Sequence, residues 1–408
     1  MFRPLCGALG LLLVAAACTR KEPPPTAPAG RGSLVTSSGP RAGAAAAEKI
    51  LARPAPCLPD GARVTPAALV DAGSSALDAA ENERALACAE DAVRLSPRHV
   101  AGLTLRADAL AALSRLDDAR LAYARALAVE PNHPDALLGA AELHVRRLGP
   151  ARDALETGLE YALRGARTAA ARKDRVLSAR LLLVAGMAEN DLGRSHRALP
   201  HLERAAAVLP EEADVAYERG VAFFELCRFA DAEKAFRRAL TLAPDDAWSL
   251  HQLGLIAERR GDDAKATKLL ARAHDLSPDD FPRDLAVDEE TFRREVKAAI
   301  AALPEDERRS LAGIPVEIQD LPEADDLLAV EPPLSPTILG LFRGPAEDEP
   351  CTAADGPRCR AIVFYRKNLI RFAHDRGELE RQVRVTLLHE LGHLHGEDDD
   401  QLRARGLE

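Results

Sequence analysis

A 34-residue period in the middle of the chain constrains its fold more than any other sequence feature. Prolines that follow hydrophobic runs recur at this spacing, apart from one interval of 79 residues, which is 34 plus 45. Alanines stand five and twelve residues before each proline. The pattern consists of Pro97, Pro131, Pro210, Pro244 and Pro278, with Ala92, Ala126, Ala205, Ala239 and Ala273, and with Ala85, Ala119, Ala198, Ala232 and Ala266. This period is the spacing of a helix–turn–helix repeat, so residues 63–282 are predicted to form about six stacked helix pairs in a curved α-solenoid.

The clearest copy of the repeat resembles the tetratricopeptide repeat. It carries Gly220, Phe223, Ala232, Phe236, Ala239 and Pro244. The third copy, about Pro134–Ala171, is expected to be irregular, with a longer second helix around Arg164–Arg175. The alternative is a non-repetitive helical bundle in which the proline spacing arises by chance. The concave groove of such a solenoid is predicted to hold a peptide or a helix of a protein partner, although a fold alone assigns no ligand.

Near the end of the chain, a predicted helix over Leu379–Leu394 carries a metal-binding pattern. Its last turns read His389-Glu390-Leu391-Gly392-His393. Two histidines four residues apart lie on one helical face, so both imidazoles can bind a single metal ion. Glu390 would then lie beside the metal, where it can take a proton from the metal-bound water.

A catalytic zinc site needs a third protein ligand and leaves the fourth position to water. Gly396 can end the helix and turn the chain back, which makes Asp399 the natural third ligand. Asp398 and Asp400 flank it and remain alternatives. His395 lies about 240° around the helix from His389 and is a poor candidate. The competing interpretations are a solvated acidic helix end after two unrelated histidines, and a folded relic that binds no metal.

The resemblance to a known family extends upstream of this motif. In order along the chain, the matching segments are Phe292, Val296, Leu303-Pro304, Val316-Glu317-Ile318, Leu339-Gly340-Leu341-Phe342-Arg343-Gly344 and Ile362-Val363-Phe364-Tyr365-Arg366. Together with the motif they resemble the minimal zincins, which are small bacterial zincin-like metallopeptidases. The resemblance covers about Asp288–Leu402 and departs from the family pattern at Leu394 and His395. It implies Zn²⁺ held by His389, His393 and Asp399, with Glu390 as the general base, and a peptide or protein as the substrate.

Residues 283–408 are predicted to form a small α+β domain, which makes the whole chain mainly α. Helices are expected over Thr291–Ala302 and near Glu305–Leu311. β-Branched and aromatic residues predict three strands, at Val316–Asp320, Ile338–Phe342 and Ala361–Leu369. Arg366 and Tyr365 could donate to an oxyanion, but at a strand end they are more often ordinary surface or core residues, so they are left out of the predicted site.

Residues 1–18 have the layout of a secretory signal, with an apolar run from Ala8 to Ala17 that is too short to span a bilayer. Ala15-Ala16-Ala17-Cys18 resembles a bacterial lipobox, which implies cleavage before Cys18 and a lipid on that residue. The alternative is an ordinary cleaved signal with an incidental cysteine. Residues 19–62, rich in Pro, Gly, Ala and Ser, are predicted to be a flexible linker. We therefore expect a lipid-anchored protein of the bacterial cell envelope, at the outer membrane and facing the periplasm.

The cysteines bear on disulfide bonding, and the net charge bears on the class of partner. Cys351 and Cys359 either close a small disulfide or remain free thiols. Cys88 and Cys227 are predicted to be packing residues inside the repeat helices, and Cys57 has no evident partner. The net charge of −10 argues against nucleic-acid binding, which needs a clustered excess of Lys and Arg.

Two functions follow from these patterns. The first is a zinc metallopeptidase in which Glu390 activates the zinc-bound water and the repeats recruit a substrate or partner. The second is a non-catalytic, lipid-anchored protein-binding scaffold with an inactive or structural metal site.

Overall fold

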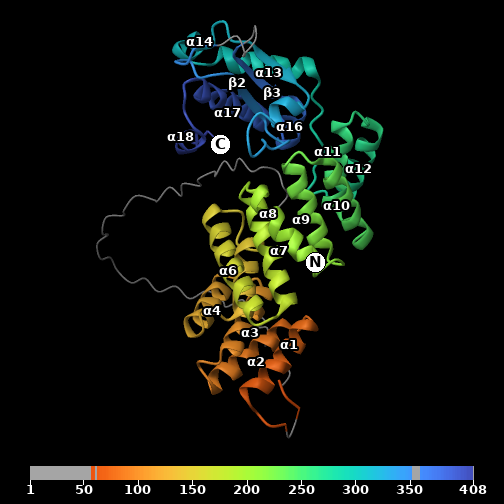
Figure 1. Ribbon diagram of the computed structural model, residues 1–408, viewed down its shortest axis with the longest axis vertical. Coiled ribbons are helices and arrows are strands. Elements are labelled where there is room, and N and C mark those ends of the chain that lie inside the picture. Colours follow the sequence, from red (N-terminus) through yellow and green to blue (C-terminus); the bar gives the residue numbers. More distant parts are fainter. Residues whose placement is uncertain (1–56, 60–61, 352–358, 408) are drawn as a thin grey trace, which may run out of the picture.

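The computed structural model describes residues 57–59, 62–351 and 359–407, so the predicted signal, Cys18 and most of the predicted linker lie outside the described residues. Between residues 62 and 282 twelve helices form six antiparallel pairs, and the pairs stack into a solenoid (Figure 1). The mainly α fold with a repeat solenoid is confirmed. The helices are α1 (Pro66–Asp78), α2 (Asn82–Leu95), α3 (Val100–Ala112), α4 (Leu116–Val129), α5 (Pro134–Arg146), α6 (Arg152–Ala171), α7 (Arg175–Asp191), α8 (Ser195–Ala206), α9 (Ala213–Glu225), α10 (Phe229–Leu242), α11 (Ala247–Arg259) and α12 (Asp263–Leu276).

The small residues of the 34-residue pattern lie where the two helices of a pair meet. Ala232 and Ala239 of α10 are fully buried. A Cβ on Gly220 of α9 would lie 2.5 Å from Cε1 of Phe236, well inside ordinary van der Waals contact. The glycine therefore lets the phenyl ring of α10 lie directly on the backbone of α9. Close approach, rather than backbone flexibility, explains why this position is small.

The third helix pair differs from the expectation in one respect. Its second helix, α6, is long, but it ends at Ala171. Lys173 has a φ of +62° in the following turn, and the Asp174 side chain accepts a hydrogen bond from the Leu177 amide as the N-cap of α7. The prediction of one helix across Arg164–Arg175 is therefore wrong, because a capping aspartate starts a new helix there.

The C-terminal domain packs helices against a small sheet (Figure 1). Its strands are β1 (Val316–Gln319), β2 (Gly340–Arg343) and β3 (Ala361–Tyr365). The strand order is β1-β3-β2, with β1 parallel and β2 antiparallel to β3. In the described residues β2 is thus an edge strand, and the fully buried β3 is central. The helices are α13 (Glu289–Ala301), α14 (Glu305–Ser310), α15 (Ala324–Leu327), α16 (Arg366–Phe372), α17 (Arg376–Leu394) and α18 (Asp399–Ala404).

The third strand is shorter than predicted. It ends at Tyr365, and Arg366–Phe372 forms α16 instead of continuing as strand to Leu369. Tertiary contacts explain why this segment is helical. In helical form Leu369 and Ile370 reach the core, while Lys367 and Arg371, four residues apart, face the last repeats on one side of α16.

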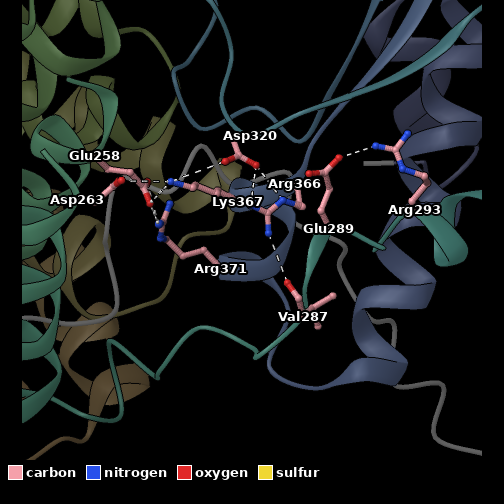
Figure 2. A network of polar contacts seen from close by, with 9 residues as sticks. All are labelled: Glu258, Asp263, Val287, Glu289, Arg293, Asp320, Arg366, Lys367 and Arg371. Carbon is pink, nitrogen blue, oxygen red and sulfur yellow. Dashed lines mark hydrogen bonds and ion pairs between the residues drawn. The ribbon is translucent and has the colours of Figure 1, made fainter. Parts of the chain in front are cut away.

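The last repeats and the C-terminal domain meet through charged groups (Figure 2). Arg371 of α16 binds Glu258 of α11 at 3.0 Å between Nη2 and Oε2, and Lys367 Nζ lies 3.3 Å from Oε1 of the same carboxylate. Arg259 Nη2 donates to the Pro322 carbonyl at 2.8 Å. These contacts join α11 both to α16 and to the segment between β1 and β2. None of the described helices is long and apolar enough to cross a membrane.

The cysteines correct two expectations. Cys57 and Cys88 form a disulfide, so Cys57 does have a partner and Cys88 is more than a packing residue. Cys227 lies in the turn between α9 and α10, with a φ of +57°, rather than inside a helix. A disulfide also joins Cys351 and Cys359.

Candidate metal centre

Helix α17 carries the two histidines, and its sequence explains how it is oriented. The Asp375 side chain accepts a hydrogen bond from the Glu378 amide at 2.8 Å and begins the helix. Apolar side chains spaced by three or four residues anchor one face in the core of the domain: Leu379, Val383, Leu387, Leu391 and Leu394. His389 and His393 lie on another face and remain partly exposed.

The chain reverses directly after α17 through a Schellman motif. Gly396 has a φ of +84°, which favours glycine. Its amide donates to the His393 carbonyl at 3.0 Å, and the Glu397 amide donates to the Gly392 carbonyl at 2.9 Å. This turn leads the chain back into α18, next to the two histidines.

The three acidic residues at the start of α18 have different partners. Asp398 is the N-cap: its side chain accepts from the Gln401 amide at 2.9 Å. Asp400 pairs with Arg403 at 2.6 Å. Asp399 faces the histidines, with its Oδ1 at 3.6 Å from Nε2 of His389 and 3.4 Å from Nε2 of His393. Of the three alternatives that the sequence leaves open, the structure therefore places Asp399 beside the imidazoles.

The spacing of the three ligand atoms fits a small divalent cation. The two Nε2 atoms lie 3.1 Å apart, so the three distances are 3.1, 3.4 and 3.6 Å. For zinc bonds of about 2.0–2.1 Å, the edges of a coordination tetrahedron measure about 3.3–3.4 Å. Two imidazole nitrogens and one carboxylate oxygen are also a ligand set that zinc accepts.

Hydrogen bonds to the other ring nitrogens orient both imidazoles. His389 Nδ1 lies 2.6 Å from the Leu407 carbonyl oxygen, and His393 Nδ1 lies 3.0 Å from that of Glu397. A carbonyl oxygen only accepts, so each Nδ1 must carry the proton. In the neutral rings, both Nε2 lone pairs then point toward the Asp399 carboxylate. Three acceptors converge with no donor among them, and a cation would stabilise that arrangement.

The proximity of these groups changes their protonation. When His389 and His393 are protonated at Nε2 they donate hydrogen bonds to Asp399, which holds the pKa of this carboxyl group far below its usual range. The hydrogen bond to Asp399 raises the pKa of His393 despite partial burial. For His389 burial lowers the pKa, but the contacts with Asp399 and Glu390 outweigh it, so the net direction is upward. A strongly acidic carboxylate is suited to binding a cation.

Glu390 lies between the helix and the edge strand. Its side chain is buried, which raises its pKa although the two histidines act against this. Its Oε2 accepts a hydrogen bond from the Phe342 amide of β2 at 2.7 Å. A Cβ on Gly340 would lie 3.0 Å from Oε1 and 2.5 Å from Cγ2 of Thr386. Only glycine at this position therefore lets β2 lie so close to the carboxylate.

Three other residues that the sequence suggested as possible site residues have partners outside the metal-binding cluster. The Tyr365 hydroxyl donates to Asp326 at 3.0 Å, and Arg366 pairs with Asp320 at 2.7 Å. His395 Nε2 lies 3.9 Å from Glu347 and is not a member of the cluster.

Sequence analysis missed Gly340, Phe342 and Leu407, although each contacts a group of the site. The Gly340 position falls inside a segment that carries the zincin resemblance, which is a signal that could have found it. The Phe342 and Leu407 contacts use backbone atoms, so residue type gives no signal for them.

Two family models match the chain. The model of a zincin-like metallopeptidase matches residues 311–407, and the model of a tetratricopeptide repeat matches residues 70–128 and 183–247. No curated protein matches the sequence.

Solved structures similar to the chain are repeat proteins. A structure described as PilW, a widely conserved type IV pilus biogenesis factor, is 18% identical and has a TM-score of 0.46, covering 57% of this chain and 99% of that one. PilF of Pseudomonas aeruginosa is 14% identical, with a TM-score of 0.45 and coverage of 57% and 97%. YrrB, described as a TPR protein with an unusual peptide-binding site, is 18% identical, with a TM-score of 0.37 and coverage of 47% and 93%.

The two family models agree with the structure of the residues that each of them matches. The helix pairs α1–α12 include the residues matched as tetratricopeptide repeats, and the His389/His393/Asp399 cluster lies within the other match. The chain carries tetratricopeptide repeats followed by a C-terminal zincin-like metallopeptidase domain.

Proposed function

We propose that the protein is a zinc-dependent metallopeptidase that hydrolyses peptide bonds. The observation that carries this proposal is the convergence of His389, His393 and Asp399 at distances that fit one zinc ion. The buried Glu390 lies between the two histidines in the same turn of α17. When bound, zinc supplies a Lewis acid that polarises the scissile carbonyl and makes water a stronger acid.

Glu390 acts as the proton carrier. Burial raises the pKa of its carboxyl group, which improves it as a base near neutral pH. The Phe342 amide holds Oε2 through a 2.7 Å hydrogen bond, so Oε1 is the oxygen left to receive the proton from water. The same carboxyl group then donates that proton to the leaving amine.

The edge of the sheet offers a place for an extended substrate. Tyr365 donates its amide to the Leu339 carbonyl at 2.9 Å, so Leu339 faces β3. Backbone groups alternate in direction along an antiparallel pair, so those of Gly340 and Phe342 face away from β3. The Phe342 amide already binds Glu390, which leaves the backbone groups of Gly340 and the Phe342 carbonyl for an added strand. A peptide added along β2 would therefore run beside Glu390.

The decisive experiment compares the wild-type protein with Glu390→Gln. We expect the wild type to cleave members of an unbiased peptide mixture, followed by mass spectrometry, and the variant to be at least about 100-fold slower. The variant should keep its zinc, since Glu390 is not a ligand, and its circular dichroism spectrum. Equal cleavage by both proteins would show that the mechanism is wrong.

The repeats and the N-terminal sequence complete the proposal. Tetratricopeptide repeats are typical of protein–protein interaction, and we propose that the solenoid recruits a substrate or a partner. We also propose a lipid anchor at Cys18 that holds the protein at the outer membrane, facing the periplasm, on the strength of the lipobox-like sequence.

The extent of the repeats favours a second candidate, a non-catalytic scaffold. Metal analysis of the purified protein distinguishes the peptidase from a scaffold that binds no metal. The peptidase requires about one zinc per chain, and a His389→Ala/His393→Ala double variant should lose that zinc. Zinc at that level without cleavage of any peptide would favour a scaffold with a structural metal site.

A further inference from the structure

Each of the two histidines of the proposed zinc centre contacts a backbone carbonyl in a Schellman motif at the end of a helix. The Schellman motif that ends α17 presents the Glu397 carbonyl to His393. Helix α18 ends in the same way: the Gly406 amide donates to the Arg403 carbonyl at 2.9 Å, and the Leu407 amide to the Leu402 carbonyl at 3.1 Å. In each case the residue after a glycine with positive φ presents its carbonyl to the Nδ1 of a ligand histidine.

The contact made by Leu407 is the shorter of the two. Its carbonyl oxygen lies 2.6 Å from His389 Nδ1, against 3.0 Å for the contact between Glu397 and His393. The Leu407 side chain is buried, and Gly406 has a φ of +74°. The carbonyl is therefore fixed both by the turn and by the apolar anchor that follows it.

From this geometry we infer that Leu407 is a positioning residue of the metal centre. Its carbonyl fixes the proton of His389 on Nδ1, so that Nε2 keeps its lone pair and points toward Nε2 of His393 and Oδ1 of Asp399. The segment 398–407 thus supplies two parts of one site, the Asp399 carboxylate and the acceptor that orients His389. This inference rests on the proposed function, because it assigns a role toward the zinc ion.

The test compares two truncations. A chain ending at Gly406 loses the acceptor, whereas a chain ending at Leu407 still presents an oxygen, now of the terminal carboxylate, at the same carbon atom. We expect the first truncation to weaken zinc binding by about 10- to 100-fold, measured by competition with a chelator. We expect the second to bind zinc as the full chain does. Equal zinc affinity in both truncated proteins would overturn the inference.

A point variant tests the turn without shortening the chain. In Gly406→Ala a Cβ would meet nothing within 4 Å, so the substitution acts only through the unfavourable positive φ. Gly193→Ala is the matched control, because Gly193 has a φ of +71° and equally open surroundings in the turn between α7 and α8. We expect Gly406→Ala to weaken zinc binding and Gly193→Ala to leave it unchanged. Equal zinc affinity in these two variants would contradict the inference.

A spectroscopic measurement covers the case in which the truncated chain fails to fold. In the full-length protein, ¹⁵N NMR of the imidazoles at a pH where they are neutral should show His389 as the Nδ1–H tautomer, without and with zinc. The Nε2–H tautomer in the zinc-free protein would overturn the inference. Failure of the proposed function looks different: the full chain would bind zinc with these tautomers and affinities but cleave no peptide.

Discussion

At the scale of single residues, the environment of Glu390 depends on the lack of a side chain at Gly340. Gly340 lies where any Cβ would meet Thr386 Cγ2 at 2.5 Å and Glu390 Oε1 at 3.0 Å. Carbon atoms in good contact are about 3.5–4.0 Å apart. The glycine therefore allows β2 to lie against α17, and the close approach brings the Phe342 amide to Glu390.

We predict that Gly340→Ala destabilises the protein by about 1–3 kcal/mol, because the added methyl group overpacks the contact between β2 and α17. Peptide cleavage should also decrease, since β2 must move away from Glu390. Urea denaturation measures the first effect and a peptide assay the second.

The control for this variant removes the atom that the new methyl group meets. Thr386→Ser deletes Cγ2 and keeps the hydroxyl group, so the double variant Gly340→Ala/Thr386→Ser should recover part of the lost stability. A single Gly340→Ala variant with wild-type stability and activity would contradict the close approach of β2 to α17.

At the scale of elements, the third ligand depends on how α18 docks on α17. Leu402 of α18 is fully buried and lies directly over Gly392, the glycine between Glu390 and His393. A Cβ at Gly392 would overlap with Cδ2 of Leu402 and would lie 3.0 Å from Oε2 of Glu397. Gly392 thus sets the distance between the helix that carries the histidines and the helix that carries Asp399.

We predict that Gly392→Ala weakens zinc binding, because α18 must move outward and take Asp399 with it. Gly377→Ala is the matched control in the first turn of the same helix, where a Cβ would come no closer than 3.3 Å to Asp375 Oδ1. Chelator competition on both variants should show a lower zinc affinity only for Gly392→Ala. An equal zinc affinity in the two variants would mean that α18 does not depend on Gly392.

At the scale of the whole molecule, the repeats and the zincin-like domain share a buried ion pair. The side chains of Glu258 and Arg371, which Figure 2 shows, are each only 10% exposed. Asp284 lies 3.5 Å from the same guanidinium group. Helix α16 also binds the segment that leads into β2, because the Asn368 side-chain amide donates to the Ile338 carbonyl at 2.8 Å. The last repeat is thereby linked through α16 to the strand that contacts Glu390.

We predict that Arg371→Ala costs up to about 3–5 kcal/mol of stability, because it removes one of the two cations beside the buried Glu258 carboxylate and leaves only Lys367. Trp248, the single tryptophan of the chain, packs on Phe281 after the last repeat and reports unfolding of that repeat by fluorescence.

The matched control is Arg293→Ala, which removes an exposed ion pair with Glu289 on α13 that Figure 2 also shows. It should cost no more than about 1 kcal/mol, because exposed pairs contribute little in water. Similar losses of stability in the two variants would argue against a buried ionic interface.

The sequence predicted what depends on spacing along the chain. Repeated alanines such as Ala232 and Ala239 are buried where the 34-residue period places them, and the predicted repeat solenoid is confirmed. The helix with His389 and His393 follows from a four-residue spacing that puts both side chains on one face. Interactions between neighbours in sequence are local, so the residue pattern is sufficient to predict them.

Other features depend on contacts between residues far apart in the chain. The sequence predicted strand as far as Leu369, but α16 begins at Arg366 and presents Lys367 and Arg371 to the last repeats. It gave Cys57 no partner, because only folding brings Cys57 to Cys88 of α2.

By itself, then, the sequence determined the period of the repeats, the helical face shared by the two histidines and the glycine that ends their helix. The tertiary structure decided which aspartate faces the imidazoles, which backbone amide holds Glu390 and which carbonyl orients His389. The physical reason is that a helical period is set by local backbone geometry. Hydrogen bonds to Phe342 and Leu407 instead use groups that every residue has, so only the approach of separate elements determines which of them takes part.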